Sequence, residues 1–106
     1  MHAIDKIFNH EDFSDQDLQD ARFENCSFYH CRFNHSDLTD AQFIRCKFIV
    51  PGEDEGCDFS YTTLTSASFK HCNLSMALFK GARCYGLELR DSNLQGSDFS
   101  RASFAN

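Results

Sequence analysis

Residues 21–48 read ARFENCSFYHCRFNHSDLTDAQFIRCKF, and a large apolar residue returns at every fifth position of this stretch. The same period extends in both directions and covers nearly the whole chain. All twelve phenylalanines lie on it. The centres before residue 49 are Phe8, Phe13, Leu18, Phe23, Phe28, Phe33, Leu38, Phe43 and Phe48, and those after residue 58 are Phe59, Leu64, Phe69, Leu74, Phe79, Cys84, Leu89, Leu94, Phe99 and Phe104.

A second column of small residues accompanies these centres. Ala, Cys, Ser or Thr stands two positions before most of them, and the flanking positions are polar. A period of five fits neither the 3.6-residue repeat of a helix nor the two-residue repeat of a strand. It fits a square coil in which each pentapeptide forms one side and four sides form a turn. Successive coils would then pair at the usual strand spacing of about 4.8 Å. The sequence therefore predicts an all-β solenoid of about five coils.

The five-residue period is interrupted once, by the segment IVPGEDEGC at residues 49–57. Either six residues are inserted between two sides, or one side lacks its apolar centre. Only the insertion aligns like residues in columns, for example Phe13, Phe33, Phe59, Phe79 and Phe99. Because Pro, Gly and acidic residues favour turns, we expect a projecting loop. Its residues are Pro51, Gly52, Glu53, Asp54, Glu55 and Gly56.

The chain of 106 residues is expected to form a single domain, 1–106, and carries a net charge of −6. Residues 1–58 hold thirteen acids and five bases, whereas residues 59–106 hold three acids and five bases. This acidity disfavours direct binding of nucleic acid and indicates either a basic partner or a solvated surface. The acids on the regular repeats include Asp17, Asp20, Asp37 and Asp40, at equivalent positions of successive coils. The sequence contains no apolar run long enough to cross a membrane and no signal-peptide pattern, so we expect a cytoplasmic protein.

The six cysteines suggest neither a disulfide framework nor a metal site. Five of them occupy the small inward position, where coil spacing slightly exceeds the usual Cβ separation of a disulfide. We therefore expect reduced, buried thiols. In CSFYHCRFNH, Cys26 and Cys31 point inward while His30 and His35 point outward, so these four side chains cannot converge on zinc. No phosphate loop or nucleophile motif is present and a stacked core leaves no pocket, so we expect no cofactor and no enzymatic activity.

This pattern resembles the pentapeptide-repeat family, whose fold is a right-handed quadrilateral β-helix. Particular strings are similar to the N-terminal half of the Qnr quinolone-resistance proteins: IDKIFNHEDFSDQDL, the inserted loop ending in EGCDFSY, and FKHCNLSMALFKGARCYGLELR. The resemblance implies binding to the bacterial type II topoisomerases, DNA gyrase and topoisomerase IV, and protection of them from quinolones. Imitation of duplex DNA and destabilisation of the drug-trapped complex are two accounts of that protection.

Qnr proteins are longer than this sequence, with a second loop and a C-terminal helix that forms an end-to-end dimer. Two hypotheses follow for the 106-residue chain. It is a topoisomerase-binding module that uses residues 51–56 and the face with Asp17 and Asp37, or it is a structural module or truncated fragment that folds and self-associates without protecting anything. Terminal coils expose apolar residues, so we also expect a C-terminal homodimer or oligomer through Leu89, Leu94, Phe99 and Phe104.

Overall fold

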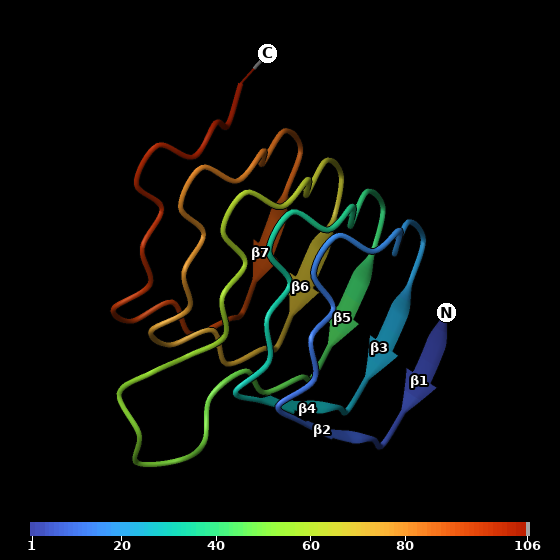
Figure 1. Cartoon of the computed structure of the whole chain (residues 1–106), viewed down its shortest axis with the longest axis vertical. Helices are drawn as coiled ribbons and strands as arrows, with labels where there is room; N and C mark the ends of the chain where they lie inside the picture. The colour runs from blue at the N-terminus through green and yellow to red at the C-terminus, as the bar shows by residue number, and fades with distance from the viewer. Residues whose placement is uncertain (106) are drawn as a thin grey trace.

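The computed structural model describes residues 1–105, and those residues form an all-β solenoid (Figure 1). The predicted fold class is confirmed. Its seven strands are three residues each: β1 (His2–Ile4), β2 (Ile7–Asn9), β3 (Arg22–Glu24), β4 (Ser27–Tyr29), β5 (Gln42–Ile44), β6 (Ser68–Lys70) and β7 (Glu88–Arg90). All pairings are parallel, in the orders β1-β3-β5-β6-β7 and β2-β4. Residues 1–105 contain no helix that could span a membrane.

The four sides of the coil are called here the first to fourth faces, in chain order. The larger sheet forms the first face, and β2-β4 begins the second. Isolated bridges continue the second face at Lys47, Asn73 and Asn93, build the third along Asp12, Arg32, Asp58, Leu78 and Asp98, and build the fourth along Asp17, Asp37, Thr63, Arg83 and Ser103. Before the loop, pairing residues are 20 apart, as in Arg22 with Gln42. Across it they are 26 apart, as in Gln42 with Ser68, which is the register that a six-residue insertion requires.

Stacked phenylalanine rings fill the interior. On the third face, Phe33 stacks on Phe59 with ring centroids 4.7 Å apart, and Phe59 on Phe79 at 5.0 Å. Rings on neighbouring faces meet edge to face, as Phe28 and Phe33 do at 5.5 Å. The apolar centres of the second, third and fourth coils are fully buried. The core is thus one continuous column of apolar side chains.

The corners of the square impose a strict backbone requirement. The residue two positions after nearly every centre has a positive φ, and fifteen of these residues are not glycine. Asp, Asn and His dominate the set because they tolerate the left-handed conformation better than most residues. Gly81, Gly86 and Gly96 take the same positions, with φ of 67°, 71° and 71°.

The solenoid begins one side earlier than the apolar lattice indicated. Ala3, at the centre of β1, pairs with Phe23 and is buried. The lattice read from the sequence starts at Phe8 because alanine at a centre is indistinguishable from an ordinary small residue. Asp5 therefore belongs to a corner of the coil, with φ of 58°.

Candidate functional site

The loop leaves the second face after Phe48 and returns to the third at Cys57 (Figure 1). The Cys57 backbone amide donates a hydrogen bond to the Phe48 carbonyl at 3.1 Å, which closes its base. A turn follows in which the Glu53 amide donates to the Val50 carbonyl at 3.0 Å. Residues 51–55 are exposed. A partner can therefore reach the acidic side chains of the loop without any change in the coil.

One polar side-chain contact ties the loop back to the coil. His30 Nε2 lies 3.2 Å from Glu53 Oε2, and the His30 ring stacks on His10 of the preceding coil at 4.9 Å. A hollow beside the loop is lined by Arg32, Glu55 and Leu78, among others. No sequence signal identified His30 as a loop contact, because His30 and Glu53 are far apart in the chain and outside any shared motif.

Gly56 seats the end of the loop against the coil. A Cβ atom added there would lie 2.7 Å from the Ser75 carbonyl oxygen and 2.8 Å from the Met76 backbone. Backbone atoms cannot move aside as a flexible side chain can. Glycine at this position therefore permits a close approach of the loop to the next coil.

The aspartates of the fourth face have a structural task. Asp17 Oδ1 accepts a hydrogen bond from the Gln19 amide at 3.1 Å, and Asp37 Oδ1 accepts one from the Thr39 amide at 3.0 Å. The same turn is formed by Asp12, Asp58, Asn73, Asn93 and Asp98. This arrangement is an Asx-turn that stabilises each corner. In each of these turns, the side-chain Oδ1 accepts a hydrogen bond from the backbone amide two residues later.

At Asp58 and Asp98, on the third face, these hydrogen bonds also favour the charged form of the carboxylate. The pKa of Asp98 lies below its ordinary value of 3.8 because the Ser100 hydroxyl and amide donate to it. Burial raises the pKa of Asp58, but hydrogen bonds from Ser60 and Asn34 outweigh it and leave that pKa below 3.8. The Asp58 and Asp98 carboxylates are therefore ionised at neutral pH.

The expected contact residues form two surfaces and not one. The loop surface, Pro51–Gly56, lies at the edge between the second and third faces. The acidic surface, defined as Asp17, Asp20, Asp37 and Asp40, lies on the fourth face and at its edge with the first. These edges are diagonally opposite in the square coil (Figure 1). Asp20 and Asp40, both with φ of 61°, occupy successive corners one coil apart.

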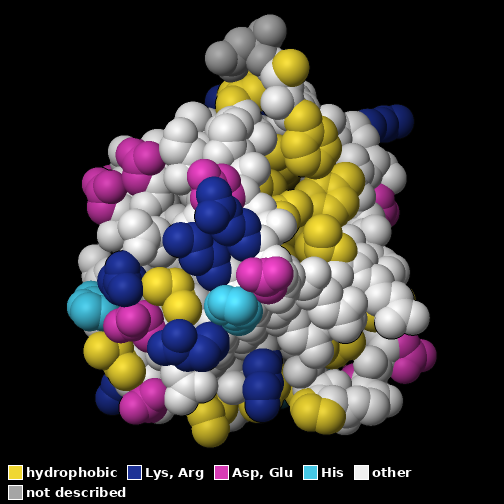
Figure 2. All heavy atoms as spheres, turned by 180° about the vertical axis from the view of Figure 1, so that it is seen from behind, with side chains coloured by type: hydrophobic (Ala, Val, Ile, Leu, Met, Phe, Trp, Pro, Cys, Tyr) yellow, Lys and Arg dark blue, Asp and Glu magenta, His cyan; other side chains and the backbone are white. Residues whose placement is uncertain are grey.

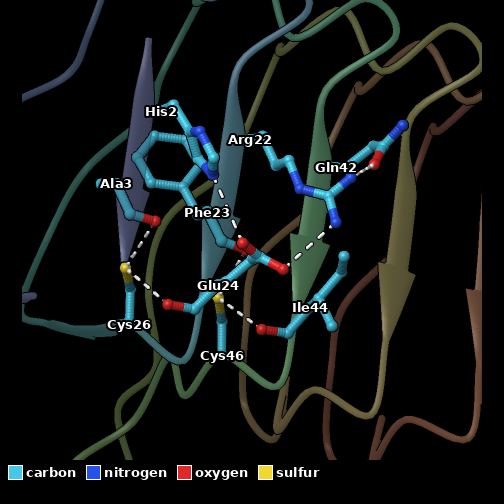
Figure 3. A network of polar contacts seen from close by, with 9 residues as sticks. All are labelled: His2, Ala3, Arg22, Phe23, Glu24, Cys26, Gln42, Ile44 and Cys46. Carbon is cyan, nitrogen blue, oxygen red and sulfur yellow. Dashed lines mark hydrogen bonds and ion pairs between the residues drawn. The ribbon is translucent and has the colours of Figure 1, made fainter. Parts of the chain in front are cut away.

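All six cysteines are buried and free. Cys26 Sγ donates to the Ala3 carbonyl at 3.5 Å and Cys46 Sγ to the Phe23 carbonyl at 3.4 Å, each in the coil before (Figure 3). Burial raises the pKa of Cys57 to about 12 and that of Cys84 to about 11. Within residues 1–105, no group of His, Cys, Asp or Glu side chains is arranged to hold a metal ion.

The apolar centres of the last coil are less covered than those before them. Leu89, Leu94 and Phe99 are half-buried, and Phe104 is 55% exposed. Figure 2 shows hydrophobic side chains gathered at the C-terminal end of the molecule.

Comparison with known proteins agrees with this geometry. The family model described as pentapeptide repeats matches residues 8–49, 57–96 and 82–106. The quinolone resistance pentapeptide repeat protein QnrB96 of Scandinavium goeteborgense is 45% identical over 85 residues, which are 80% of this chain and 40% of that protein. The pentapeptide repeat protein QnrB4 of Escherichia coli is 46% identical over 61 residues, 58% of this chain and 28% of that protein.

The solved structures give the same relationship. Full-length QnrB1, a plasmid-mediated fluoroquinolone resistance protein, matches all of this chain with a TM-score of 0.92 and 34% identity. The match covers 50% of the QnrB1 chain. This chain thus spans about half the length of the relatives it resembles.

Proposed function

This chain belongs to the pentapeptide-repeat family, and from that membership we propose that it is a non-enzymatic protein that binds DNA gyrase and topoisomerase IV and protects them from quinolones. The observation that carries this proposal is the 45% identity to a quinolone resistance protein over 80% of the chain. The close structural match to half of QnrB1, itself a fluoroquinolone resistance protein, supports it.

Charge on the rod supports imitation of DNA as the mode of binding. With the side centred on Ala3 included, ten sides precede the loop and make about 2.5 turns, or roughly 12 Å of rod at strand spacing. Residues 1–58 carry a balance of −8. That density is of the same order as the one charge per about 1.7 Å of duplex DNA. Asp17 and Asp37 are bridge partners in adjacent coils, so these charges recur along the rod axis as phosphates do.

The diagonal placement of the two surfaces limits how a partner can bind. A flat partner would touch either the loop surface or the acidic surface. A cleft that takes up a DNA duplex would enclose the rod and reach both. We therefore assign the acidic surface to the wall of such a cleft and the loop surface to a second contact across it.

The test is a gyrase supercoiling assay with ciprofloxacin, with and without the protein. We expect added protein to restore supercoiling in the presence of the drug. No rescue across a wide range of protein concentration, together with no binding to gyrase, would leave the alternative of a structural module without protecting activity.

A set of charge-neutral variants locates the contact. Asn keeps both the Oδ1 acceptor of the Asx-turn and the tolerance for positive φ, so Asp→Asn at residues 17, 20, 37 and 40 removes four charges while preserving the coil. We expect this variant to lose protection. The matched control changes Asp5, Asp12, Asp91 and Asp98 to Asn and should protect as the parent does. Equal loss in both variants would assign protection to net charge and not to the acidic surface.

A further inference from the structure

A stripe of positive charge follows the edge between the first and second faces. We call it the basic edge, and its residues are Arg45, Lys47, Lys70 and Arg90. The pairings of Ile44 with Lys70 and of Lys70 with Arg90 place these cations on three successive coils. All four are exposed, and Figure 2 shows Lys and Arg side chains gathered on this side of the molecule.

Most of these charges have no counter-ion within the protein. Arg90 Nε lies 3.3 Å from Glu88 Oε2. Within residues 1–105, Arg45, Lys47 and Lys70 form no ion pair. The nearby Glu24 is already held by Arg22 at 3.1 Å and by His2 at 3.3 Å (Figure 3). The charge of the basic edge is therefore available to a partner.

The basic edge borders a hollow rich in hydrogen-bond donors. Arg45, Lys47 and His71 line it, together with Asn73 and Asn93. Asn73 Oδ1 accepts from the Ser75 amide at 3.0 Å, and Asn93 Oδ1 accepts from the Gln95 amide at 2.9 Å. Their Nδ2 groups remain as donors. Asp91 is the one acid among the described lining residues, so the hollow suits a ligand that brings oxyanions.

The length of the basic edge favours a short polyanionic ligand over a long one. Towards the N-terminus, the same edge carries Asp5 and the same sheet carries Glu24. A nucleic acid, with one charge per about 1.7 Å of duplex, would extend past the three basic coils and meet these acids. A few carboxylates on a protein surface would fit within them. Arginine binds carboxylates and phosphates alike through two parallel hydrogen bonds, so the length of the basic edge separates the two ligands and the arginine chemistry does not.

We propose that the basic edge binds a short carboxylate-rich segment of a protein partner. This surface is separate from the loop surface and the acidic surface, and the proposal does not depend on topoisomerase binding. Arg45 and Lys47 hold the carboxylates at the hollow, Lys70 and Arg90 hold those further along, and the Asn73 and Asn93 amides donate to the same oxygens.

The test is a titration of the isotope-labelled protein with hexaglutamate peptide, followed by amide chemical shifts. We expect saturable shifts confined to residues 44–47, 70–73 and 90–93. Lys47→Gln with Lys70→Gln should raise Kd about tenfold, and added salt should weaken binding further. The matched control, Lys80→Gln with Arg83→Gln, removes the same charge from the third and fourth faces and should leave Kd unchanged.

Three results would overturn the proposal. The first is an absence of saturable shifts at millimolar peptide in a protein whose circular dichroism is unchanged. The second is an equal rise of Kd in the control variant, which would indicate attraction by overall charge. The third is a short DNA duplex that shifts the same amides at lower concentration than hexaglutamate, which would assign the edge to phosphate.

Discussion

At the scale of single residues, two hydroxyl side chains show how the coil accommodates a buried polar group. Both stand at the inward position two residues before an apolar centre. Ser36 and Thr62 occupy this position in adjacent coils of the fourth face, and both are buried. Thr62 Oγ1 donates to the Phe59 carbonyl at 2.7 Å. Within the described residues, Ser36 Oγ has no hydrogen-bond partner. The two hydroxyls therefore contribute differently to stability.

Ser36→Ala should leave the free energy of unfolding unchanged or raise it by up to about 1 kcal/mol, because it removes an unpaired polar group. Thr62→Ala should lower it by about 1–3 kcal/mol, through a lost hydrogen bond and a small cavity. Urea unfolding followed by circular dichroism measures both, with Thr62→Ser as the control that keeps the hydroxyl. An equal loss for Ser36→Ala would mean that its hydroxyl has a partner in solution.

The thiols give a second prediction at this scale. Because burial raises the pKa of Cys57 to about 12 from an ordinary value of 9.0, the folded state favours the neutral thiol. That contribution to stability is complete below pH 9 and is lost as the pH rises towards 12. We expect slow alkylation of the native protein at neutral pH and fast alkylation after denaturation. A disulfide between stacked cysteines, detected by mass spectrometry of the native protein, would contradict the prediction of reduced thiols.

At the scale of elements, the coil and the loop are nearly independent. The bridges of Lys47 with Asn73 and of Arg32 with Asp58 continue the ladders on both sides of the loop. The base of the loop is closed by the hydrogen bond that the Cys57 amide donates to the Phe48 carbonyl. The loop touches the coil where Gly56 approaches the Ser75 and Met76 backbone and through the exposed pair of His30 with Glu53. Exposed pairs of this kind contribute little to stability.

Deletion of residues 51–56 should restore a coil of twenty residues and leave the fold intact. We expect an unchanged circular dichroism spectrum and a Tm within a few degrees of the parent. If the loop serves as a partner contact, the same variant should lose affinity for gyrase. Unfolding on deletion would instead show that these residues form part of a side of the coil.

At the scale of the whole molecule, the two ends of the solenoid differ. In the first coil, Lys6, Glu11 and Gln16 replace the small inward residue and are exposed, which suits a polar cap. In the last coil, the apolar pattern continues to Phe104. Burying one Phe or Leu contributes about 1.5–3 kcal/mol, so covering these centres favours association.

The 106-residue chain should therefore associate through the end that holds Leu89, Leu94, Phe99 and Phe104. Light scattering at high micromolar concentration should give a mass above that of the monomer, and Phe104→Asp should return it towards the monomer. The control is Ile7→Asp, because Ile7 is exposed and lies at the opposite end of the solenoid. Phe8→Asp is less suitable because it would disturb the core. A strict monomer that Phe104→Asp leaves unchanged would refute the prediction.

The sequence by itself determined the architecture of this protein, because a five-residue apolar period leaves a chain few ways to bury its centres other than a square coil. The same period located the loop and predicted the inward cysteines. Tertiary structure alone decided how the surfaces are arranged. It placed Glu53 beside His30, set the loop surface and the acidic surface on opposite edges, and gathered Arg45, Lys70 and Arg90 on one edge. These contacts join residues of different coils, and each outward position tolerates many residue types. The repeat that specifies the core therefore carries little information about the contacts on the surface. Local hydrogen bonding also gives Asp17 and Asp37 a structural role in their turns, which the count of charges along the chain did not indicate.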